Sequence, residues 1–460
     1  MSASTSLCLP LFSNFPAAFE ELFSRESCAL IFAQHGPRGG GQAKLNGWEW
    51  LMSRVYHELA RSGTFSSNTK AVSGVRISDS ALSQRALSIG EKMIEEILPI
   101  ALRPLAERER DAQAFYNAYR LVAIDGTRFN LRNTGTINEQ ASKVACNRGS
   151  GEPAFAHLLA VVLVELGMHQ PLGTRLGWQG EGELTLARQL FAAQDLPERS
   201  LLLADRLFGY PSLIWGLWSM LRRTHSYVLV RIKSNLKAKR TRQLADGSWL
   251  VEVKAVDPST TRKKMGVLEL REIYGRVCYE DQSGHRSCLQ IRLWTSLLDD
   301  TTCPATELIA LYAARWEEEL FFRELKSHLH ARGELLDALT PQTAAQEVLA
   351  MLLAAALIAK QRQSVASAAG VEPLRISFAK VLHKTAALCE LLQVGADLIT
   401  PQALAQWIQR LLDDLICDAV IKKRRPRTCP RTLRQPTKDW PKTKVAQSKR
   451  VVKTIEVTNP

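Results

Sequence analysis

The sequence lacks the marks of several common protein classes. Its nine cysteines include no CxxC pair and no Cys/His cluster at zinc spacing, which predicts a reduced cytoplasmic protein. The longest apolar run, 348–359, has 12 residues and is too short to span a membrane. No basic region with a signal-length apolar run opens the chain. The glycine-rich segment 36–44 lacks the Lys-Ser/Thr ending of a phosphate-binding loop. We therefore expect no membrane partner.

Positive charge is concentrated near the C-terminus. Of the net charge of +14, residues 422–453 hold +12, from thirteen Lys or Arg and one acid. Four prolines in this segment favour an extended chain, so 422–460 is predicted to be a disordered tail. Basic tails of this kind commonly bind nucleic acid. The tail begins with Lys422, Lys423, Arg424 and Arg425, which are candidate DNA contacts, and a solubilising tail is the alternative.

The other segments predict an α/β protein with helical ends. Amphipathic runs at 45–61 and 79–98 indicate helices, the second capped by Ser78 or Asp79, with a polar loop at 62–78 between them. Short apolar runs follow, then a segment rich in β-formers with turn signals. The expected divisions are a helical region at 1–115, which is a DNA-binding domain or a plain bundle, a mixed-sheet core at 116–224, an antiparallel β insertion at 225–304, a core helix at 305–340, C-terminal helices at 341–421 and the tail at 422–460.

The segment 312–328, YAARWEEELFFRELKSH, predicts an amphipathic helix with three consecutive glutamates. At about 100° per residue, one narrow stripe gathers Tyr312, Arg315, Glu319 and Lys326. Glu317 and Glu318 fall away from that stripe and are expected at the surface or in local ion pairs. For Arg315 and Glu319, the alternative is an ordinary exposed ion pair one turn apart.

Two aspartates end or interrupt apolar runs that predict buried strands. Asp125 follows LVAI and Asp205 follows LLLA. Each has a structural alternative, since Asp125-Gly126 is a hairpin-turn signal and Asp205 suits a helix N-cap. Together with Glu319 they form a set of hard oxygen ligands suited to two Mg²⁺ or Mn²⁺ ions. A pair of such ions can promote in-line displacement at phosphorus.

The spacing of Tyr312, Arg315, Glu319 and Lys326 resembles the signature of DDE transposases of the insertion-sequence-four family. Other passages look like the same family: AIDGT at 123–127, LLLADRLFGY at 201–210, RIKSN at 231–235 and ISFAKVLHK at 376–384. The resemblance runs in order from about 75 to 395 and implies an RNase H-like core with a β-rich insertion.

The resemblance also implies roles for individual residues. Asp125, Asp205 and Glu319 become the metal-binding triad, supported by Tyr312, Arg315 and Lys326. Trp294 lies where relatives can carry an aromatic residue that stacks on a displaced base, with a core tryptophan as the alternative. Lys233 becomes a candidate DNA-backbone contact, with a solvated strand residue as its alternative.

The implied activity is cutting of double-stranded DNA at transposon ends and joining to target DNA. The implied assembly is a homodimer on the DNA, associated with the nucleoid in a bacterial cytoplasm. Two alternatives use the same residues differently. One is a catalytically silent DNA-binding protein, and the other is a nuclease without strand transfer.

Overall fold

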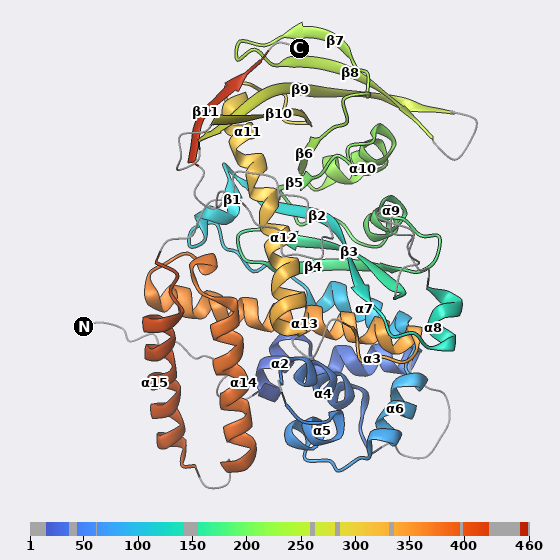
Figure 1. Cartoon of the computed structure of the whole chain (residues 1–460), viewed down its shortest axis with the longest axis vertical. Helices are drawn as coiled ribbons and strands as arrows, with labels where there is room; N and C mark the ends of the chain where they lie inside the picture. Colours follow the sequence, from blue (N-terminus) through green and yellow to red (C-terminus); the bar gives the residue numbers. More distant parts are fainter. Residues whose placement is uncertain are drawn as a thin grey trace.

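The structure is a computed structural model that describes residues 15–35, 44–60, 62–141, 155–257, 263–280, 286–330, 335–395, 399–422 and 451–458. Within these ranges, eleven strands form one mixed sheet, with helices on both faces and a helical layer at one end (Figure 1). This confirms the predicted α/β class.

The first part of the sheet has the strand order β4-β3-β2-β5-β6. Its strands are β2 (Tyr119–Asn130), β3 (His157–Glu165), β4 (Gln170–Gly177), β5 (Ser200–Ala204) and β6 (Tyr227–Arg231), with the short β1 (Phe115–Tyr116) beside β2. β2, β3 and β4 pair antiparallel, whereas β2, β5 and β6 pair parallel. β5 is buried along its whole length, as its unbroken apolar sequence predicts for a strand covered on both faces.

The predicted β insertion continues this sheet. Its strands are β7 (Lys239–Gln243), β8 (Trp249–Val256), β9 (Lys264–Glu280) and β10 (Arg286–Thr295), all joined by antiparallel pairs. β6, which falls inside the predicted insertion at 225–304, is a core strand that pairs with β5 on one side and β10 on the other.

The predicted disorder of 422–460 is wrong for its last part. Val451–Val457 form β11, which pairs antiparallel with residues 275–280 of β9. β11 lies on the same side of β9 as β8. β8 pairs with residues 264–272 of β9, and β11 pairs with residues 275–280. The residues between 422 and 451 lie outside the described part of the chain.

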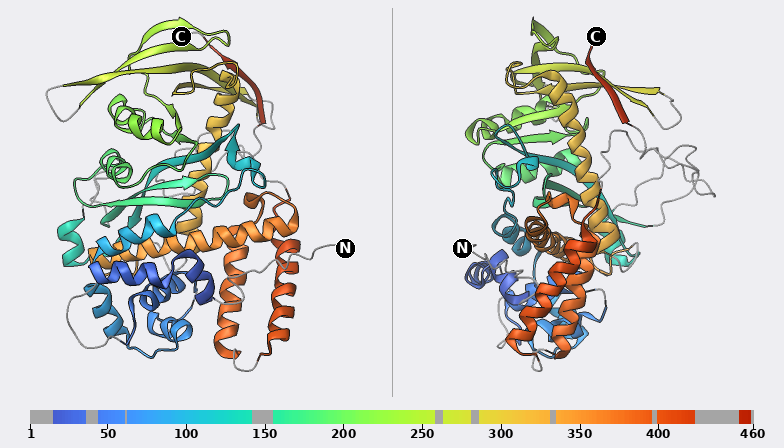
Figure 2. Two further views of the ribbon diagram at one scale, coloured as in Figure 1. Left: turned by 180° about the vertical axis from the view of Figure 1, so that it is seen from behind. Right: turned by 90° about the vertical axis from the view of Figure 1, so that its left-hand side faces the viewer.

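Helices cover the two faces of the sheet (Figure 2). On one face, α9 (Glu183–Ala193) and α10 (Pro211–Arg223) share a core with Val122 and Ile124 of β2. On the other face, α11 (Ala305–Tyr312) packs against Leu121 and Ala123. The chain continues from α11 through a 3-10 turn (Ala313–Arg315), α12 (Trp316–Arg323) and a π-helical segment, η3 (Glu324–Leu329).

The helical layer surrounds α13 (Pro341–Ala369). Its other members are α2 (Phe15–Leu22), α3 (Arg25–His35), α4 (Gly47–Leu59), α5 (Phe65–Ser73), α6 (Asp79–Ser88), α7 (Glu91–Ala101), α8 (Gly135–Gln140), α14 (Phe378–Gly395) and α15 (Pro401–Ala419). Ser78 caps α6 as predicted, by accepting a hydrogen bond from the Ala81 amide. The predicted loop at 62–78 instead contains α5, which Thr64 caps, and the predicted helix at 79–98 is divided by Gly90.

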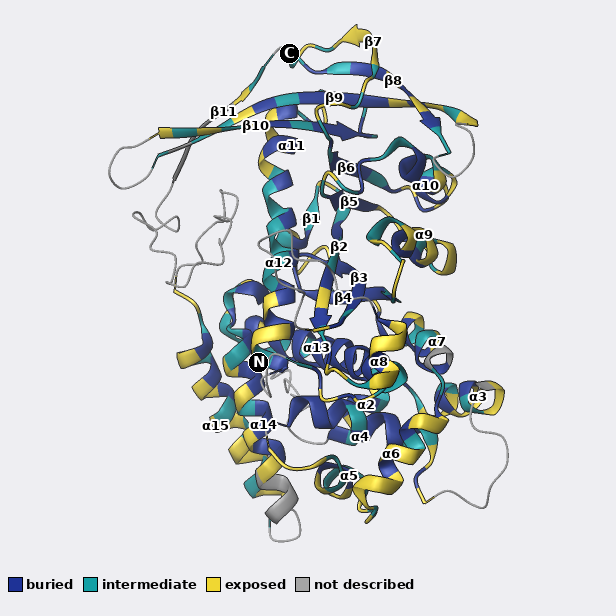
Figure 3. Ribbon diagram, turned by 45° about the vertical axis from the view of Figure 1, so that its right-hand side comes forward, coloured by how far each residue is buried: buried dark blue, intermediate teal, exposed yellow. Residues whose placement is uncertain are grey.

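α13 is long and apolar enough to cross a membrane by length and composition alone. In the fold, 89% of its most apolar window is buried, and Figure 3 shows it as a dark-blue helix among other elements. A helix that is apolar on all sides is expected at the centre of a large protein core. Its composition is therefore explained by packing.

The expectation that all cysteines are reduced is wrong for one pair. Cys278 and Cys288 are direct cross-strand partners on β9 and β10, and their sulfur atoms form a disulfide. Sequence spacing does not reveal this pair, because the two residues come together only through the register of the two strands.

Candidate active site

Asp125 lies within β2. The strand continues to Asn130, so the hairpin-turn interpretation of Asp125-Gly126 is wrong. Odd-numbered residues of β2 face α11 and α12, which places Asp125 on the same side as the helix that carries Glu319. The Gly126 amide donates a 2.8 Å hydrogen bond to Oδ1 of Asp125.

Asp205 directly follows β5. Ile124 and Ala204 are paired across the parallel strands β2 and β5, so Asp125 and Asp205 are the next residues on two neighbouring strands. Oδ1 of Asp205 accepts a 2.6 Å hydrogen bond from the Leu207 amide. Because α10 begins at Pro211 after Tyr210, the N-cap interpretation of Asp205 is wrong.

The helix opposite these strands brings the third acid. The Tyr312 hydroxyl donates a 3.1 Å hydrogen bond to the carbonyl oxygen of Ala204 and so fixes the helix to the end of β5. The Arg315 guanidinium lies between two carboxylates, 3.3 Å from Oδ2 of Asp125 and 3.4 Å from Oε1 of Glu319. Arg315 is buried and also reaches Asp125, so its contact with Glu319 is more than an exposed ion pair within one helix.

Burial of these charges changes their proton affinities. Burial raises the pKa of Asp125 to about 7, although the Arg315 guanidinium opposes this shift, and the Asp205 carboxylate raises the pKa further. Burial alone would lower the pKa of Arg315, but Tyr312 and the nearby carboxylates raise it above its usual value. The Asp125 carboxyl therefore binds its proton more tightly than an exposed aspartate does.

Lys326 is placed differently from the wheel prediction. It lies in the π-helical segment, where the wider turn changes the angular position of each residue. Its ammonium group donates a 2.6 Å hydrogen bond to the Arg128 carbonyl oxygen and lies over the Phe129 ring. Partial burial of the ammonium group and the nearby Arg128 lower the pKa of Lys326 to about 8, although much of its side chain is exposed.

Glu318 is a site residue that the sequence analysis missed. Its expected surface position is wrong, because its side chain is 0% exposed. Neither of its carboxylate oxygens accepts a hydrogen bond from the described residues. Burial raises the pKa of Glu318 well above its usual range, and the Asp125 carboxylate adds to this effect. Helical periodicity alone could not separate Glu318 from an exposed glutamate.

Glu183, the first residue of α9, approaches the site from the other face of the sheet. A Cβ atom on Gly126 would lie only 2.4 Å from Cδ of Glu183, so the glycine makes this close approach possible. Burial and the Asp205 carboxylate raise the pKa of Glu183. The Asp-Gly pair in the sequence was the one available signal, and it also suited a hairpin turn.

Glu317 joins a buried network beside the triad. Nε2 of His169 lies 3.0 Å from Oε2 of Glu317, and Nδ1 of His169 lies 2.7 Å from Oε2 of Glu324. Arg362 of α13 lies 3.3 Å from Glu324. The predicted local ion pair of Glu317 is therefore a long-range contact that connects the helix to the β3–β4 turn.

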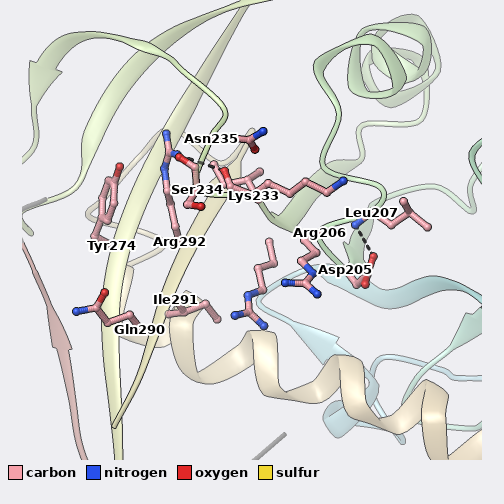
Figure 4. Close-up of a pocket in the computed structure, with 12 residues that line it drawn as sticks. Asp205, Arg206, Leu207, Lys233, Ser234, Asn235, Tyr274, Gln290, Ile291 and Arg292 are labelled. Atoms are coloured by element: carbon pink, nitrogen blue, oxygen red, sulfur yellow. Dashed lines mark hydrogen bonds between the residues drawn. The ribbon is translucent and has the colours of Figure 1, made fainter. Parts of the chain in front are cut away.

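A cavity of about 790 Å³ opens beside Asp205, between β6 and the strands of the insertion (Figure 4). The cations that line it are Arg206, Arg231, Lys233 and Arg292. Arg292 is held by the buried carboxylate of Glu272. Lys233 is only partly exposed, and its Nζ donates a 2.7 Å hydrogen bond to the Tyr210 hydroxyl.

Trp294 does not line this cavity. It is 0% exposed, packs in the core between the sheet and α10, and donates a 2.9 Å hydrogen bond from Nε1 to Glu272. In this structure a base cannot stack on it, so the core interpretation holds and the base-stacking one is wrong. Of the predicted tail contacts, Lys422 is exposed, whereas Lys423, Arg424 and Arg425 lie outside the described residues.

The donor chemistry of the site fits divalent cations. Hard carboxylate oxygens predominate, and the buried Glu318 oxygens have no hydrogen-bond partner among the described residues. In that part of the chain, no three acidic, histidine or cysteine side chains are grouped closely enough to hold an ion as they stand. Cation binding therefore requires rotation of the acidic side chains.

Comparison with known proteins identifies related sequences. The family model described as the transposase DDE domain matches residues 116–357. The chain is 28% identical over 263 residues to the transposase InsG for insertion sequence element IS4 of Escherichia coli, covering 56% of each protein. It is 29% identical over 126 residues to the putative transposase y4zB of Sinorhizobium fredii, covering 26% of this chain and 33% of that protein. The chain thus spans about half or less of these curated relatives.

Among solved structures, the chain is similar to the piggyBac transposase in a synaptic complex with hairpin DNA. The two share 12% sequence identity and a TM-score of 0.40 over 93% of this chain and 88% of that one. A likeness at this level supports no argument about fold or function.

Proposed function

The chain belongs to the family described as the transposase DDE domain, and we propose that it nicks DNA at the ends of a mobile element and joins the freed 3′-hydroxyl to target DNA. The supporting observation is the meeting of acids from distant parts of the chain. Ile124 and Ala204 pair across the neighbouring strands β2 and β5, and Asp125 and Asp205 are the residues that directly follow them. Arg315 bridges Asp125 to Glu319.

In this proposal Asp125, Asp205 and Glu319 hold the metal ions. Two Mg²⁺ or Mn²⁺ ions, when bound, activate an attacking oxygen and stabilise the leaving oxygen at phosphorus. Arg315 favours the ionised form of the acids beside it. Tyr312 positions the catalytic helix against the end of β5 and does not contact the DNA.

Double-stranded DNA is the proposed partner, bound by a homodimer in the bacterial nucleoid. Arg206 and Arg231 line the cavity beside Asp205 and form no ion pair within the described ranges, so they are available to phosphate groups. Lys233 adds a third positive charge there. The helical region at 1–115 is proposed to contribute further DNA contacts.

We also propose an RNase H-like description for the five strands β2 to β6. Its support is the strand order, with an antiparallel meander followed by two parallel strands, and the position of the first two acids at neighbouring strands. β7 to β10 are then the insertion between Asp205 and Glu319.

The test is Mg²⁺-dependent nicking of linear DNA that carries the element's own ends. We expect Asp125→Asn, Asp205→Asn and Glu319→Gln each to abolish nicking and to leave DNA binding largely intact, because each change removes a cation ligand. Glu317→Gln is the matched control on the same helix and should retain nicking. A plasmid target with a 3′-hydroxyl donor end tests joining.

Each contrary result would favour a different alternative. Nicking by Glu319→Gln at the wild-type rate would refute the assigned triad. Binding without cutting by the wild-type protein would favour a catalytically silent DNA-binding protein. Cutting without joined products would favour a nuclease.

A further inference from the structure

The Glu318 carboxylate has an unusual environment for an acidic side chain. It is fully buried, and neither oxygen accepts a hydrogen bond from the described residues. An ionised carboxylate in such a place costs several kcal/mol unless a positive charge compensates it. Its position therefore requires an explanation that packing alone does not give.

The charges around Glu318 are mostly negative. Asp125 and Asp205 both act on it electrostatically, and Arg315 is the cation that acts on it. Arg315 is already shared, since it bridges Asp125 and Glu319. The Asp125 amide also favours the charged form of Glu318, but its geometry falls short of a hydrogen bond. Arg315 thus pairs with Asp125 and Glu319, whereas Glu318 forms no ion pair with the described residues.

We propose that Glu318 supplies a further carboxylate ligand to the divalent cations that Asp125 and Asp205 hold. The inference rests on the proposed function, because it adds a ligand to the same cation site. The cations are of the hard, oxygen-preferring class, Mg²⁺ or Mn²⁺. Their charge offsets the negative charge that Arg315 leaves uncompensated.

The position of Glu318 on the helix agrees with this role. It precedes Glu319 by one residue, and Arg315 interacts electrostatically with both. The same guanidinium therefore acts on both glutamates and on Asp125. Glu317 differs from both, because it is directed to His169.

The experiment is calorimetric titration of the full-length protein with MnCl₂ in the absence of DNA, together with thermal unfolding with and without Mn²⁺. Glu318→Gln keeps the shape of the side chain and removes its charge. We expect Mn²⁺ affinity to fall about tenfold or more. We also expect Mn²⁺ to raise the melting temperature of the wild-type protein more than that of Glu318→Gln, because a ligand that binds the folded state more tightly stabilises it more.

Four further variants make the result interpretable. Glu317→Gln is the neighbouring control and should leave Mn²⁺ affinity unchanged. Glu318→Met, an apolar residue of similar length, replaces the glutamine variant if that protein fails to fold. Asp125→Asn and Glu319→Gln test the cation site itself, and each should weaken Mn²⁺ binding.

The outcomes separate this inference from the proposed function. Unchanged Mn²⁺ affinity in Glu318→Gln, with weakened binding in Asp125→Asn and Glu319→Gln, would overturn the inference and leave the triad standing. Unchanged affinity in all three variants would overturn the cation site and the inference together. An equal loss in Glu317→Gln and Glu318→Gln would also overturn it, because the loss would then reflect general damage to the helix.

Discussion

Three adjacent glutamates illustrate how environment separates identical side chains. Glu317 contacts a buried histidine, Glu318 is enclosed near two aspartates, and Glu319 pairs with Arg315. All three lie on one turn of α12, so their sequence context is nearly the same. The surface that each one faces, not its chemistry, decides its role.

Tyr312 gives a prediction at the residue scale. Tyr312→Phe removes the hydroxyl that binds the Ala204 carbonyl oxygen and leaves that buried acceptor without its partner. We expect the free energy of unfolding to fall by about 1–2 kcal/mol. Urea unfolding measures this change.

The same variant tests what Tyr312 contacts. Because its hydroxyl is buried against β5, we expect the salt dependence of DNA binding to equal that of the wild type. A weaker salt dependence in Tyr312→Phe would instead place the hydroxyl against a DNA phosphate.

At the scale of elements, the helix that carries Glu319 is held by contacts at both ends. Tyr312 fixes its start to β5, and His169 contacts Glu317 and Glu324 on either side of Glu319. His169 adopts a left-handed backbone conformation with φ of 54°, at the turn between β3 and β4. The π-helical segment begins at Glu324, where this contact is made.

His169→Asn tests this contact, because asparagine tolerates the same backbone conformation and lacks the ring. Burial alone would lower the pKa of His169, but Glu324 and Glu317 raise it above the usual value. Its stabilising contribution is therefore complete below about pH 6.5 and is lost as pH rises through the raised pKa. We expect the variant to lose about 3 kcal/mol at pH 6 and less at alkaline pH.

Unfolding free energies measured from pH 5.5 to 9 give the comparison. His225→Asn is the matched control, since His225 also has a positive φ, 51°, and is exposed. A pH-independent loss in His169→Asn would show that the histidine is neutral in the folded protein.

The sequence was sufficient to predict features that depend on residues close together in the chain. Ser78 caps a helix, and Asp205 follows an apolar strand as its sequence indicates. It was insufficient to predict features that depend on contacts between distant segments. Thr64 starts a helix inside a polar segment, and Glu318 is buried on a helix that packs against β2. Trp294 is a core residue because strands and α10 from distant parts of the chain pack around it, and Glu272 on the neighbouring strand accepts its hydrogen bond.

At the scale of the molecule, the basic stretch 423–450 lies in the sequence between two described contacts. Arg375 binds the carbonyl oxygens of Ile421 and Lys422, and β11 begins at Val451. Eleven Lys or Arg lie at 423–450. Their charge can therefore be changed without altering β11.

Two variants test separately the charge of residues 423–450 and the pairing of β11 with β9. Changing those eleven residues to Gln should reduce the slope of log Kobs against log salt by several units, at about 0.9 for each DNA phosphate that the protein no longer neutralises. Truncation after residue 450 keeps the charge and removes β11. It should leave that slope unchanged and expose to hydrogen exchange those amides of 275–280 that point to β11 and not to β10.

Binding isotherms at several salt concentrations and hydrogen exchange of both variants provide the readouts. An unchanged slope in the glutamine variant would mean that the segment does not touch DNA. Retained amide protection in the truncated protein would mean that β11 is dispensable for that edge of the sheet.

The pairing of β6 with β10 has a mechanical consequence. Leu229, Val230 and Arg231 are joined to Thr295, Trp294 and Leu293, and β6 is the strand next to the one that precedes Asp205. A hinge between insertion and core would have to break these pairs. We therefore expect the insertion and the aspartates to move together, so that DNA bound across both, as proposed, would be the partner that bends.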